Sequence, residues 1–318
     1  VIDVPAANDG NVDLIKLDAA MVAAKAEKAK PTLIRMKSVI AWPAPKAKNT
    51  AESHGSALGA DEIAATKTLL GLNPDQHFAM PDEVLAHVRE VKARGAAKRQ
   101  SWNNDFAKWQ KDQPERATLL KRLIAGELPN GWDSALPQYP AGKDVATRKA
   151  SGEVIAAIAT VLPEFWGGSA DLAGSNNTSI TSAGSFLPAT SKMVGANPYG
   201  RMIHFGIREH AMGSILNGIA LHGLSRSFGG TFAVFSDYMR PAVRLAAIMD
   251  LPSTFIWTHD SIGLGEDGPT HQPIEHLASL RAIPNFAVVR PADANEVREA
   301  WKSIMRRRKP VGLLLSRQ

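Results

Sequence analysis

The sequence predicts an α/β fold built on a parallel sheet, because short apolar strands alternate with amphipathic helices along most of the chain. The length of 318 residues exceeds one typical domain, and the 44% of hydrophobic residues can fill a substantial core. Charged residues make up 21% of the chain and form no long run of one sign, which argues against disorder. We therefore expect a folded protein of about two domains.

The first segment contains expected strands at residues 1–4 and 32–42 and expected helices at about residues 14–28 and 61–71. Asp61 is expected to be the N-cap of the second helix, and Gly71 is expected to end it. No initiator methionine, signal peptide or transit peptide precedes the first strand, so we expect the chain to begin inside a domain.

The middle of the chain is polar and helical, without an expected strand. One helix is expected to start at Pro81, and a second is expected from Pro114 to a stop at Gly126. The Pro- and Gly-rich residues 129–143 indicate a domain boundary. The expected organisation is a partial domain at 1–75, a helical connector at 76–144 and a complete domain at 145–318.

The α/β alternation returns after this boundary. The expected strands are residues 165–170, 202–205, 227–234, 253–258, 287–289 and 312–315. The expected helices are residues 154–161, 209–221, 238–249, 273–280 and 295–305. Residue types that bind ligands follow several of these strands. Open parallel sheets bind ligands at the carboxyl ends of their strands, so these positions agree with a single site.

The composition excludes several kinds of site. The chain has no cysteine, which excludes disulfides, thiolate metal sites and a cysteine nucleophile, and which agrees with a cytoplasmic location. A net charge of +6 can attract nucleic acid, anionic lipid or anionic metabolites, but we favour a solvated basic surface because no nucleic-acid motif is present. No stretch is long and apolar enough to span a membrane, so neither nucleic acid nor a membrane is an expected partner.

The densest cluster of functional groups is the segment THDSIGLGEDGPTHQP, residues 258–273, which follows an expected strand and precedes an expected helix. It combines histidines, acidic residues and glycines in one loop, and glycine lets a backbone approach a small polar ligand closely. A loop that only caps a helix would explain a single Asp or His, but it does not explain the complete string. The segment therefore indicates a binding site.

This segment is similar to a signature of the transketolase family, whose members use thiamine diphosphate to move two-carbon ketol units between sugar phosphates. Other segments match the family in the same order: GGSADL at 167–172, HFGIREHAM at 204–212, three aromatic residues after them, and RPAD at 290–293. The resemblance covers essentially the whole chain. It implies the family's three-layer, parallel-sheet fold, with a pyrimidine-binding domain at 145–318 preceded by the end of the diphosphate-binding domain and the connector.

The resemblance implies that Glu209 is catalytic and binds the cofactor, because the matching glutamate hydrogen-bonds N1′ of the aminopyrimidine ring. A carboxyl group between apolar segments can hold or share a proton there. By resemblance, Phe232, Phe235 and Tyr238 surround that ring, and Asp171 lies near the cofactor at a dimer interface. Taken singly, such residues are more commonly helix-dipole acids, core aromatics or helix caps.

The resemblance also implies a set of substrate-binding residues. Positions that match phosphate-binding residues are Arg148, Ser175, His259 and Arg290. Guanidinium groups suit this role because they grip phosphate in a bidentate manner. Asp267 matches a residue that contacts a substrate hydroxyl, and His271 matches one that contacts the ketol oxygens and exchanges protons. His54 matches a histidine near the diphosphate and the donor sugar, so we expect both His271 and His54 to be catalytic.

One part of the family's site is missing. Transketolases hold the cofactor diphosphate and a divalent cation, Mg²⁺, with a Gly-Asp-Gly segment and a downstream Asn. No Gly-Asp-Gly occurs here; the nearest strings are Asn8-Asp9-Gly10 and Glu266-Asp267-Gly268, without the matching context. We expect the metal and diphosphate ligands outside this chain, no metal ligand within it, and a homodimer with its site between subunits.

Several functions are weighed on this basis. The first is a transketolase of the pentose phosphate pathway, which transfers the ketol unit from a ketose phosphate to an aldose phosphate through a thiamine diphosphate carbanion. The alternatives are a dihydroxyacetone synthase-type enzyme and a catalytically silent interaction or regulatory module with the same fold. We expect a fragment that is inactive alone, or else a naturally divided subunit. The first domain should then have a truncated sheet and exposed apolar surface.

Overall fold

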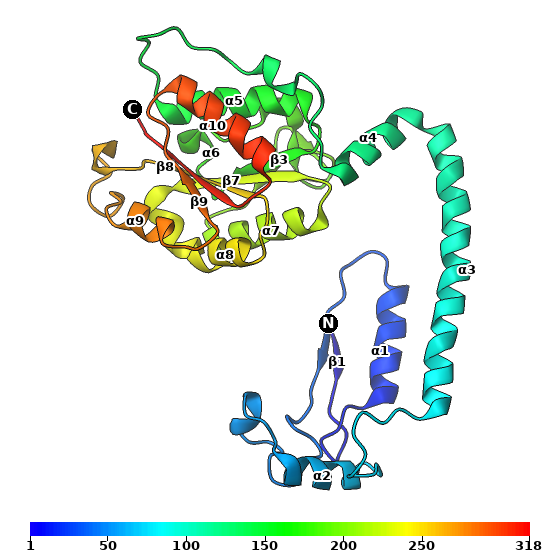
Figure 1. Cartoon of the computed structure of the whole chain (residues 1–318). Helices are drawn as coiled ribbons and strands as arrows, with labels where there is room; N and C mark the ends of the chain where they lie inside the picture. Colours follow the sequence, from blue (N-terminus) through cyan, green and yellow to red (C-terminus); the bar gives the residue numbers. More distant parts are fainter. The chain divides into compact units, whose positions relative to one another are not determined.

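The computed structural model describes residues 1–318, and the chain divides into two compact units. Unit 1 is residues 1–103 and unit 2 is residues 104–318; Figure 1 colours both along the sequence. Unit 1 contains a two-stranded sheet, and unit 2 contains an eight-stranded sheet. None of the helices combines the length with the apolar character needed to cross a bilayer.

Unit 1 begins with a parallel pair of short strands, β1 (Ile2–Val4) and β2 (Ile34–Met36), which are connected through helix α1 (Leu14–Ala26). The predicted strand at 32–42 was therefore too long. The pairing ends because β1 stops before Pro5, which has no N–H to donate, and because the chain after β2 folds into turns.

Helix α2 (Ala60–Leu69) follows the short 3₁₀ helix η1 (Glu52–His54). Its N-cap is Gly59 and not the predicted Asp61, which lies in the first turn, where its negative charge suits the helix dipole. Gly71 lies just beyond the helix with a φ of 71°, the left-handed conformation that ends many helices, as predicted.

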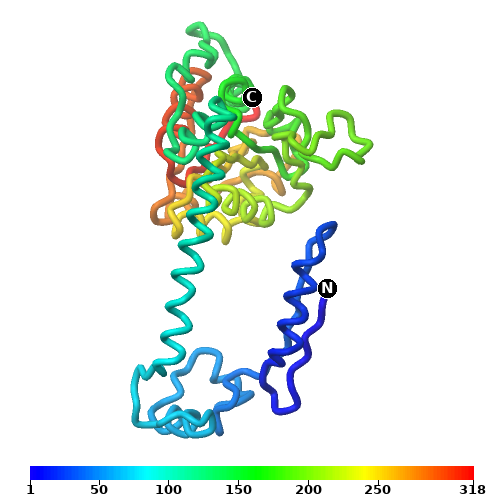
Figure 2. The backbone as a smooth tube through the Cα atoms, turned by 90° about the vertical axis from the view of Figure 1, so that its right-hand side faces the viewer, coloured from blue at the N-terminus to red at the C-terminus, as the bar shows by residue number.

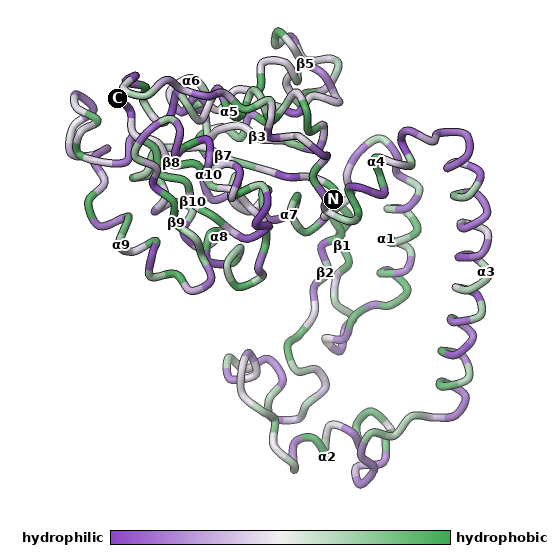
Figure 3. The backbone as a smooth tube through the Cα atoms, turned by 45° about the horizontal axis from the view of Figure 1, so that its top comes forward, coloured by the Kyte–Doolittle hydropathy of each residue, from purple (hydrophilic) through white to green (hydrophobic).

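The apolar residues of unit 1 are mostly exposed. Its buried hydrophobic residues are only Val4, Ala20 and Ala44, whereas Ile15 on α1 is 84% exposed and Leu33 beside β2 is 63% exposed. Figure 3 shows the apolar character along α1 in green. Apolar surface of this extent is typical of a face that packs against other protein, and it matches the expected exposed surface.

Two helices form the middle of the chain, α3 (Asp82–Asp112) and α4 (Pro114–Ala125). Pro114 occupies the first turn of α4, and Gly126 ends it with a φ of 68°, as predicted. Neither helix has a fully buried residue, and Figure 2 shows α3 as one uninterrupted helix. This stretch is polar and helical, in agreement with the sequence.

The sheet of unit 2 has the strand order β5-β4-β6-β3-β7-β8-β10-β9, and every neighbouring pair is parallel. The strands are β3 (Phe165–Ser169), β4 (Ser185–Phe186), β5 (Ala196–Asn197), β6 (Met202–His204), β7 (Arg226–Phe232), β8 (Ser253–Thr258), β9 (Ala287–Val289) and β10 (Val311–Leu315). The parallel sheet is as predicted, except that β4 and β5 were not expected. Strands of two residues are too short to show a periodic pattern.

Helices cover both faces of this sheet, so that unit 2 has three layers (Figure 1). One face carries α5 (Thr147–Val161) and α10 (Ala294–Arg307). The other carries α7 (Glu209–His222), α8 (Ser236–Ile248) and α9 (His276–Arg281). A separate hydrophobic core fills each interface, and the largest fully buried side chains of unit 2 are tryptophans and phenylalanines: Trp257, Trp301, Phe165, Phe228 and Phe255.

Close strand packing explains two glycines of the GGSADL segment. A Cβ added to Gly167 would lie 2.4 Å from the ring of Phe228, and one added to Gly168 would lie 1.8 Å from the carbonyl oxygen of Ile203. Only glycine fits both positions. The first turns of α5 were missed in the sequence, and so was the one-turn helix α6 (Ala173–Asn176), which follows β3. Helices this short lack the apolar periodicity that identifies longer ones.

Candidate active site

Most residues of the predicted site lie along one edge of the sheet of unit 2. Strands β6, β3, β7, β8, β10 and β9 are consecutive neighbours, and their carboxyl ends meet at one edge because all pairs are parallel. Residues of the predicted site follow these strands: Glu209 after β6, Asp171 after β3, Phe232 at the end of β7, His259 after β8 and Arg290 after β9. Such an edge is where open α/β sheets bind ligands.

An aromatic row runs from the end of β7 into α8. The rings of Phe232 and Phe235 stack with centroids 5.7 Å apart, and Phe235 and Tyr238 stack at the same distance. His271, from the loop before α9, meets this row edge-on at 5.4 Å from Phe235 and 6.1 Å from Phe232. The rings offer a flat apolar surface with a titratable imidazole at its side, which suits a planar heteroaromatic ligand.

His259 lies at the centre of the residues that were predicted to bind substrate. Its ring lies 3.7 Å from that of Phe232, and its Nε2 lies 3.5 Å from Nη1 of Arg148. Burial, reinforced by the positive charge of Arg148, lowers the pKa of His259 to about 4, so the ring is neutral at physiological pH. The residue has a φ of 57°, a left-handed conformation that costs on the order of 1 kcal/mol and often marks functional positions.

Arg148 connects this histidine to the loop after β3. Its Nη1 donates to the backbone carbonyl of Ser175 at 2.7 Å. Burial lowers the pKa of Arg148, but a guanidinium group stays charged at physiological pH. The structure thus brings together Arg148, Ser175 and His259, all of which the sequence assigned to phosphate binding. A half-buried cation beside a neutral imidazole can bind an anionic group.

The loop after β8 contributes further charged groups. Nε of Arg290 donates to Asp260 at 2.6 Å. Asp260 directly follows His259 in the chain, so this ion pair brings Arg290 to the same loop. Nη1 of Arg317, after β10, donates to Glu266 at 2.8 Å, and hydrogen bonds from Arg317 lower the pKa of Glu266 to about 2. The pairing of Asp260 with Arg290 and of Glu266 with Arg317 was not predicted from the sequence, although both acids belong to the signature segment.

Asp267 lies exposed between two glycines with left-handed backbone, Gly265 and Gly268. No hydrogen bond or ion pair joins its carboxylate to the other predicted residues, but its negative charge acts on both Arg148 and His259. A carboxylate held on such a tight turn can accept hydrogen bonds from a ligand hydroxyl.

Glu209 is the first residue of α7, and it is only 7% exposed. No hydrogen bond or ion pair within the chain engages its carboxyl group. Most of the residue is buried, but its carboxyl oxygens are not among the fully buried polar atoms that lack a partner, so they remain open to a hydrogen bond from a ligand. Asp171 follows β3 with a φ of 62°, again in the left-handed region, and is exposed.

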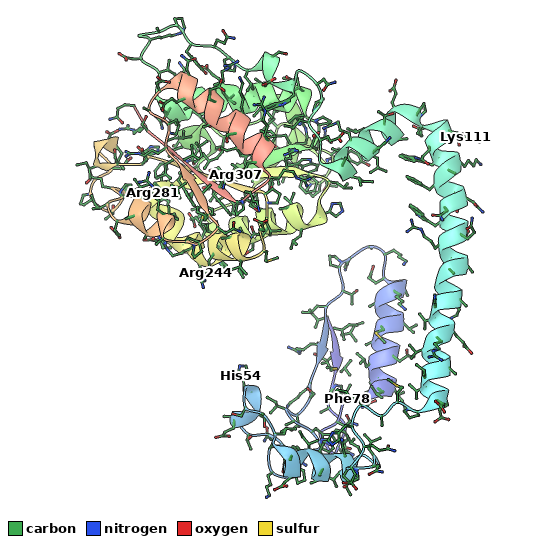
Figure 4. The ribbon with its side chains drawn as sticks, in the orientation of Figure 1. His54, Phe78, Lys111, Arg244, Arg281 and Arg307 are labelled. Carbon is green, nitrogen blue, oxygen red and sulfur yellow. The ribbon has the colours of Figure 1, made fainter.

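His54 lies elsewhere in the chain. It belongs to the 3₁₀ helix η1 of unit 1, where its side chain is exposed, and it is labelled in Figure 4. All the other predicted site residues belong to unit 2. The predicted site residues that lie together in unit 2 therefore do not include His54.

One cluster has the composition of a metal site. The side chains of Asp237, Glu275 and His276 place potential ligand atoms within 4.8 Å of one another. Nη2 of Arg240 lies 3.2 Å from Asp237 and donates to Ser279, and His276 Nε2 lies 3.0 Å from the other Asp237 oxygen. Because the carboxylate is already engaged by a guanidinium and an imidazole, we interpret the cluster as an ion-pair network.

Comparison with known families decides the relationship. The family model of the transketolase pyrimidine binding domain matches residues 143–318, more than half of the chain. The chain belongs to the transketolase family. The model of the transketolase thiamine diphosphate binding domain matches residues 3–129, which supports thiamine diphosphate as the cofactor. The family resemblance and the fold expected from the sequence are thus confirmed.

Individual transketolases agree with this assignment. The transketolase of Mycobacterium leprae is 54% identical over 316 residues, which cover 98% of this chain and 45% of that protein. The transketolase of Geobacillus stearothermophilus is 51% identical over 312 residues, again 98% of this chain and 46% of that protein. The chain therefore spans about half the length of the transketolases it matches.

Solved structures show the same fold. A Pichia stipitis transketolase, crystallised in complex with sedoheptulose-7-phosphate, superposes with a TM-score of 0.92 at 45% identity, covering 100% of this chain and 47% of that one. A Leishmania mexicana transketolase superposes with a TM-score of 0.91 at 38% identity, covering 100% of this chain and 46% of that one. The roles of individual residues stay predictions.

Proposed function

We propose that the complete protein is a transketolase, which transfers a two-carbon ketol unit from a ketose phosphate to an aldose phosphate, and that this chain supplies the pyrimidine side of the active site. The observation that carries the proposal is the position of Glu209, whose carboxyl group has no partner within the chain and lies on the same sheet edge as the aromatic row and the predicted phosphate-binding residues. Solved relatives in complex with sedoheptulose-7-phosphate or xylulose-5-phosphate support the substrate class.

The residues present fit the aminopyrimidine end of thiamine diphosphate. Phe232, Phe235 and Tyr238 would pack around the ring, and Glu209 would hydrogen-bond a ring nitrogen. When bound, thiamine diphosphate supplies a carbon nucleophile for the substrate carbonyl. Glu209 would hold or share the proton on the ring nitrogen. Asp171, at the end of β3, is proposed to line the same site.

The sugar phosphate would bind next to the aromatic row, where the ring of His259 lies 3.7 Å from that of Phe232. Arg148 provides positive charge beside His259, Arg290 provides it beside the neighbouring Asp260, and the neutral imidazole provides a further hydrogen bond. Asp267 would orient a substrate hydroxyl, and His271, beside the aromatic row, would exchange protons with the ketol oxygens. Ser175, which follows β3 on α6, would complete the phosphate contacts. His54 is proposed to join the site from the other domain.

The remaining parts of the proposal concern the whole protein. We propose that Mg²⁺ and the diphosphate are held by residues outside this chain, because no Gly-Asp-Gly occurs in it. The domain division is proposed at residues 1–75, 76–144 and 145–318. A cytoplasmic location agrees with the absence of cysteine.

A homodimer is supported by one exposed face of unit 2. Helices α7 and α8 pack against each other and present apolar side chains to solvent: Ile215 is 46% exposed, Leu245 is 50% exposed and Ile248 is 65% exposed. The cofactor residue Tyr238 is exposed on the same helix α8. Exposed apolar helix faces of this kind mark protein interfaces, and here the face adjoins the proposed cofactor site.

The proposal is tested by Glu209→Gln in the complete enzyme. The amide cannot hold the proton of a carboxyl group, so we expect ketol transfer to fall about 10²- to 10⁴-fold while the fold is retained. Glu115→Gln is the matched control, because Glu115 is exposed and also lies in the first turn of its helix. Turnover of Glu209→Gln at the level of the control would remove Glu209 from catalysis and refute the assignment of this site.

A further inference from the structure

A line of buried polar side chains leads to His259, and none of its members is among the residues predicted to bind the cofactor or the substrate. It runs from Ser169 at the end of β3 to Asn176 on α6 and to Thr258 at the end of β8. These side chains are 3%, 1% and 0% exposed. A buried network of hydrogen bonds holds its side chains in one arrangement, so this line can fix the orientation of the group at its end.

The contacts of this line indicate a direction for its hydrogen bonds. Oγ of Ser169 lies 3.0 Å from Oδ1 of Asn176 and 2.9 Å from the carbonyl oxygen of Gly230, which share its one proton, and Nδ2 of Asn176 donates to Oγ1 of Thr258 at 2.7 Å. Thr258 Oγ1 therefore accepts from the amide, and its single proton is free to donate. It lies 2.8 Å from Nδ1 of His259, which consequently accepts. In a neutral imidazole the proton must then be on Nε2.

The Nε2 atom is the one that faces the substrate-binding groups. It lies 3.5 Å from Nη1 of Arg148, at the limit of a hydrogen bond and far longer than the bond at Nδ1. Two donors, a guanidinium and an imidazole N–H, thus converge on one position. This is a suitable arrangement for a phosphate oxygen, whereas a ring with its proton on Nδ1 would direct a lone pair at that oxygen.

Gly230 leaves space for the loop that carries Asn176, and helix α6 connects this buried line to Arg148. A Cβ added to Gly230 on β7 would lie 2.7 Å from Thr178 and 3.5 Å from Cβ of Asn176, so glycine is needed beside this loop. Helix α6 also carries Ser175, whose carbonyl accepts from Arg148 at 2.7 Å. The same short helix therefore positions both donors, Arg148 directly and His259 through Thr258.

We propose that Asn176 and Thr258 are positioning residues that hold the proton of His259 on Nε2, where it donates to the phosphate group of the substrate. The inference rests on the proposed transketolase function and deepens it. It gives Asn176 and Thr258 an indirect part in substrate binding, because they act on the substrate only through His259. Removing the hydroxyl of Thr258 frees Nδ1 to take the proton, and the ring then loses its donor toward the phosphate.

The test is a comparison of Thr258→Val and Thr258→Ser in the complete enzyme, with ketol transfer to phosphorylated and unphosphorylated aldehydes. Valine has the shape of threonine without its hydroxyl, whereas serine keeps the hydroxyl. We expect Thr258→Val to raise KM for phosphorylated substrates about threefold to tenfold with little change in kcat, and Thr258→Ser to restore it. Thr254→Val, a buried threonine on the same strand, is the control for packing effects.

A double variant separates positioning from a general structural effect. If Thr258 acts through His259, the KM of His259→Ala should not rise further when Thr258→Val is added. Asn176→Asp offers a second route, because its carboxylate would accept from Thr258 and divert the proton from His259; it should raise the same KM. Equal KM values for Thr258→Val and Thr258→Ser in an active enzyme would overturn the inference alone. An inactive wild-type enzyme would refute the proposed function, and the inference with it.

Discussion

Replacing His259 with glutamine should remove a pH-dependent part of the stability of unit 2. Burial lowers the pKa of this histidine from 6.5 to about 4. The unfolded chain therefore binds a proton between these pH values that the folded chain does not bind. Stability from this residue is complete above pH 6.5 and is lost as the pH falls toward 4, since protons favour the unfolded state.

The magnitude follows from the same two values. Each pKa unit corresponds to about 1.4 kcal/mol, so the complete effect approaches about 3 kcal/mol, of which about 2 kcal/mol falls between pH 7 and pH 5. Over that interval the free energy of unfolding of the wild-type protein should decrease by about 2 kcal/mol more than that of His259→Gln. The comparison cancels the titration of all groups that the two proteins share.

Urea denaturation at pH 7 and pH 5 measures this difference. Tryptophan fluorescence reports on unit 2, because Trp257 on β8 and Trp301 on α10 are fully buried in its two cores. Parallel loss of stability in both proteins would contradict the reasoning. It would mean that His259 titrates at its ordinary pKa and is hydrated, and the buried hydrogen bond from Thr258 would have to be abandoned.

Two further predictions concern the phosphate site and the sheet. Arg290→Ala should raise KM for phosphorylated sugars about 10- to 100-fold and leave unphosphorylated substrates almost unchanged, as steady-state kinetics would show; Arg281→Ala, at an exposed arginine, is the control (Figure 4). An equal loss with both substrate types would contradict a phosphate role. Gly168→Ala should destabilise the fold by more than about 3 kcal/mol in thermal unfolding, because its Cβ would lie 1.8 Å from the carbonyl oxygen of Ile203, whereas Gly55→Ala meets open space. Similar melting temperatures for the two variants would refute that packing argument.

The sequence predicted those parts of the fold that repeat locally. Strands β8 and β9 have the predicted bounds, because their apolar runs are bordered by clear turn signals. Strands β4 and β5 were missed, since two residues carry no periodicity. The N-cap of α2 was misplaced because glycine can begin a helix without a side-chain hydrogen bond, whereas an acid such as Asp61 is the usual signal.

The site was predictable to the extent that it follows strand ends and a family pattern. His259 and Arg290 could be placed at one sheet edge from the parallel topology alone. The hydrogen bond between Asn176 and Thr258 could not be foreseen, because it joins residues far apart in sequence through the pairing of β3, β7 and β8. The pairing of Arg317 with Glu266 depends likewise on the position of β10 in the sheet.

The most direct test of the central claim is to follow a ketose phosphate labelled with ¹³C at its first two carbons, using the complete enzyme with thiamine diphosphate, Mg²⁺ and an aldose phosphate acceptor. Mass spectrometry of the products would locate the label. We expect both labelled carbons to move together to the acceptor, giving a ketose two carbons longer than the acceptor, and Glu209→Gln to lower the rate of this transfer about 10²- to 10⁴-fold. Label that stays in the donor, or that moves as a single carbon, would contradict the assignment of this chain to a ketol-transferring active site.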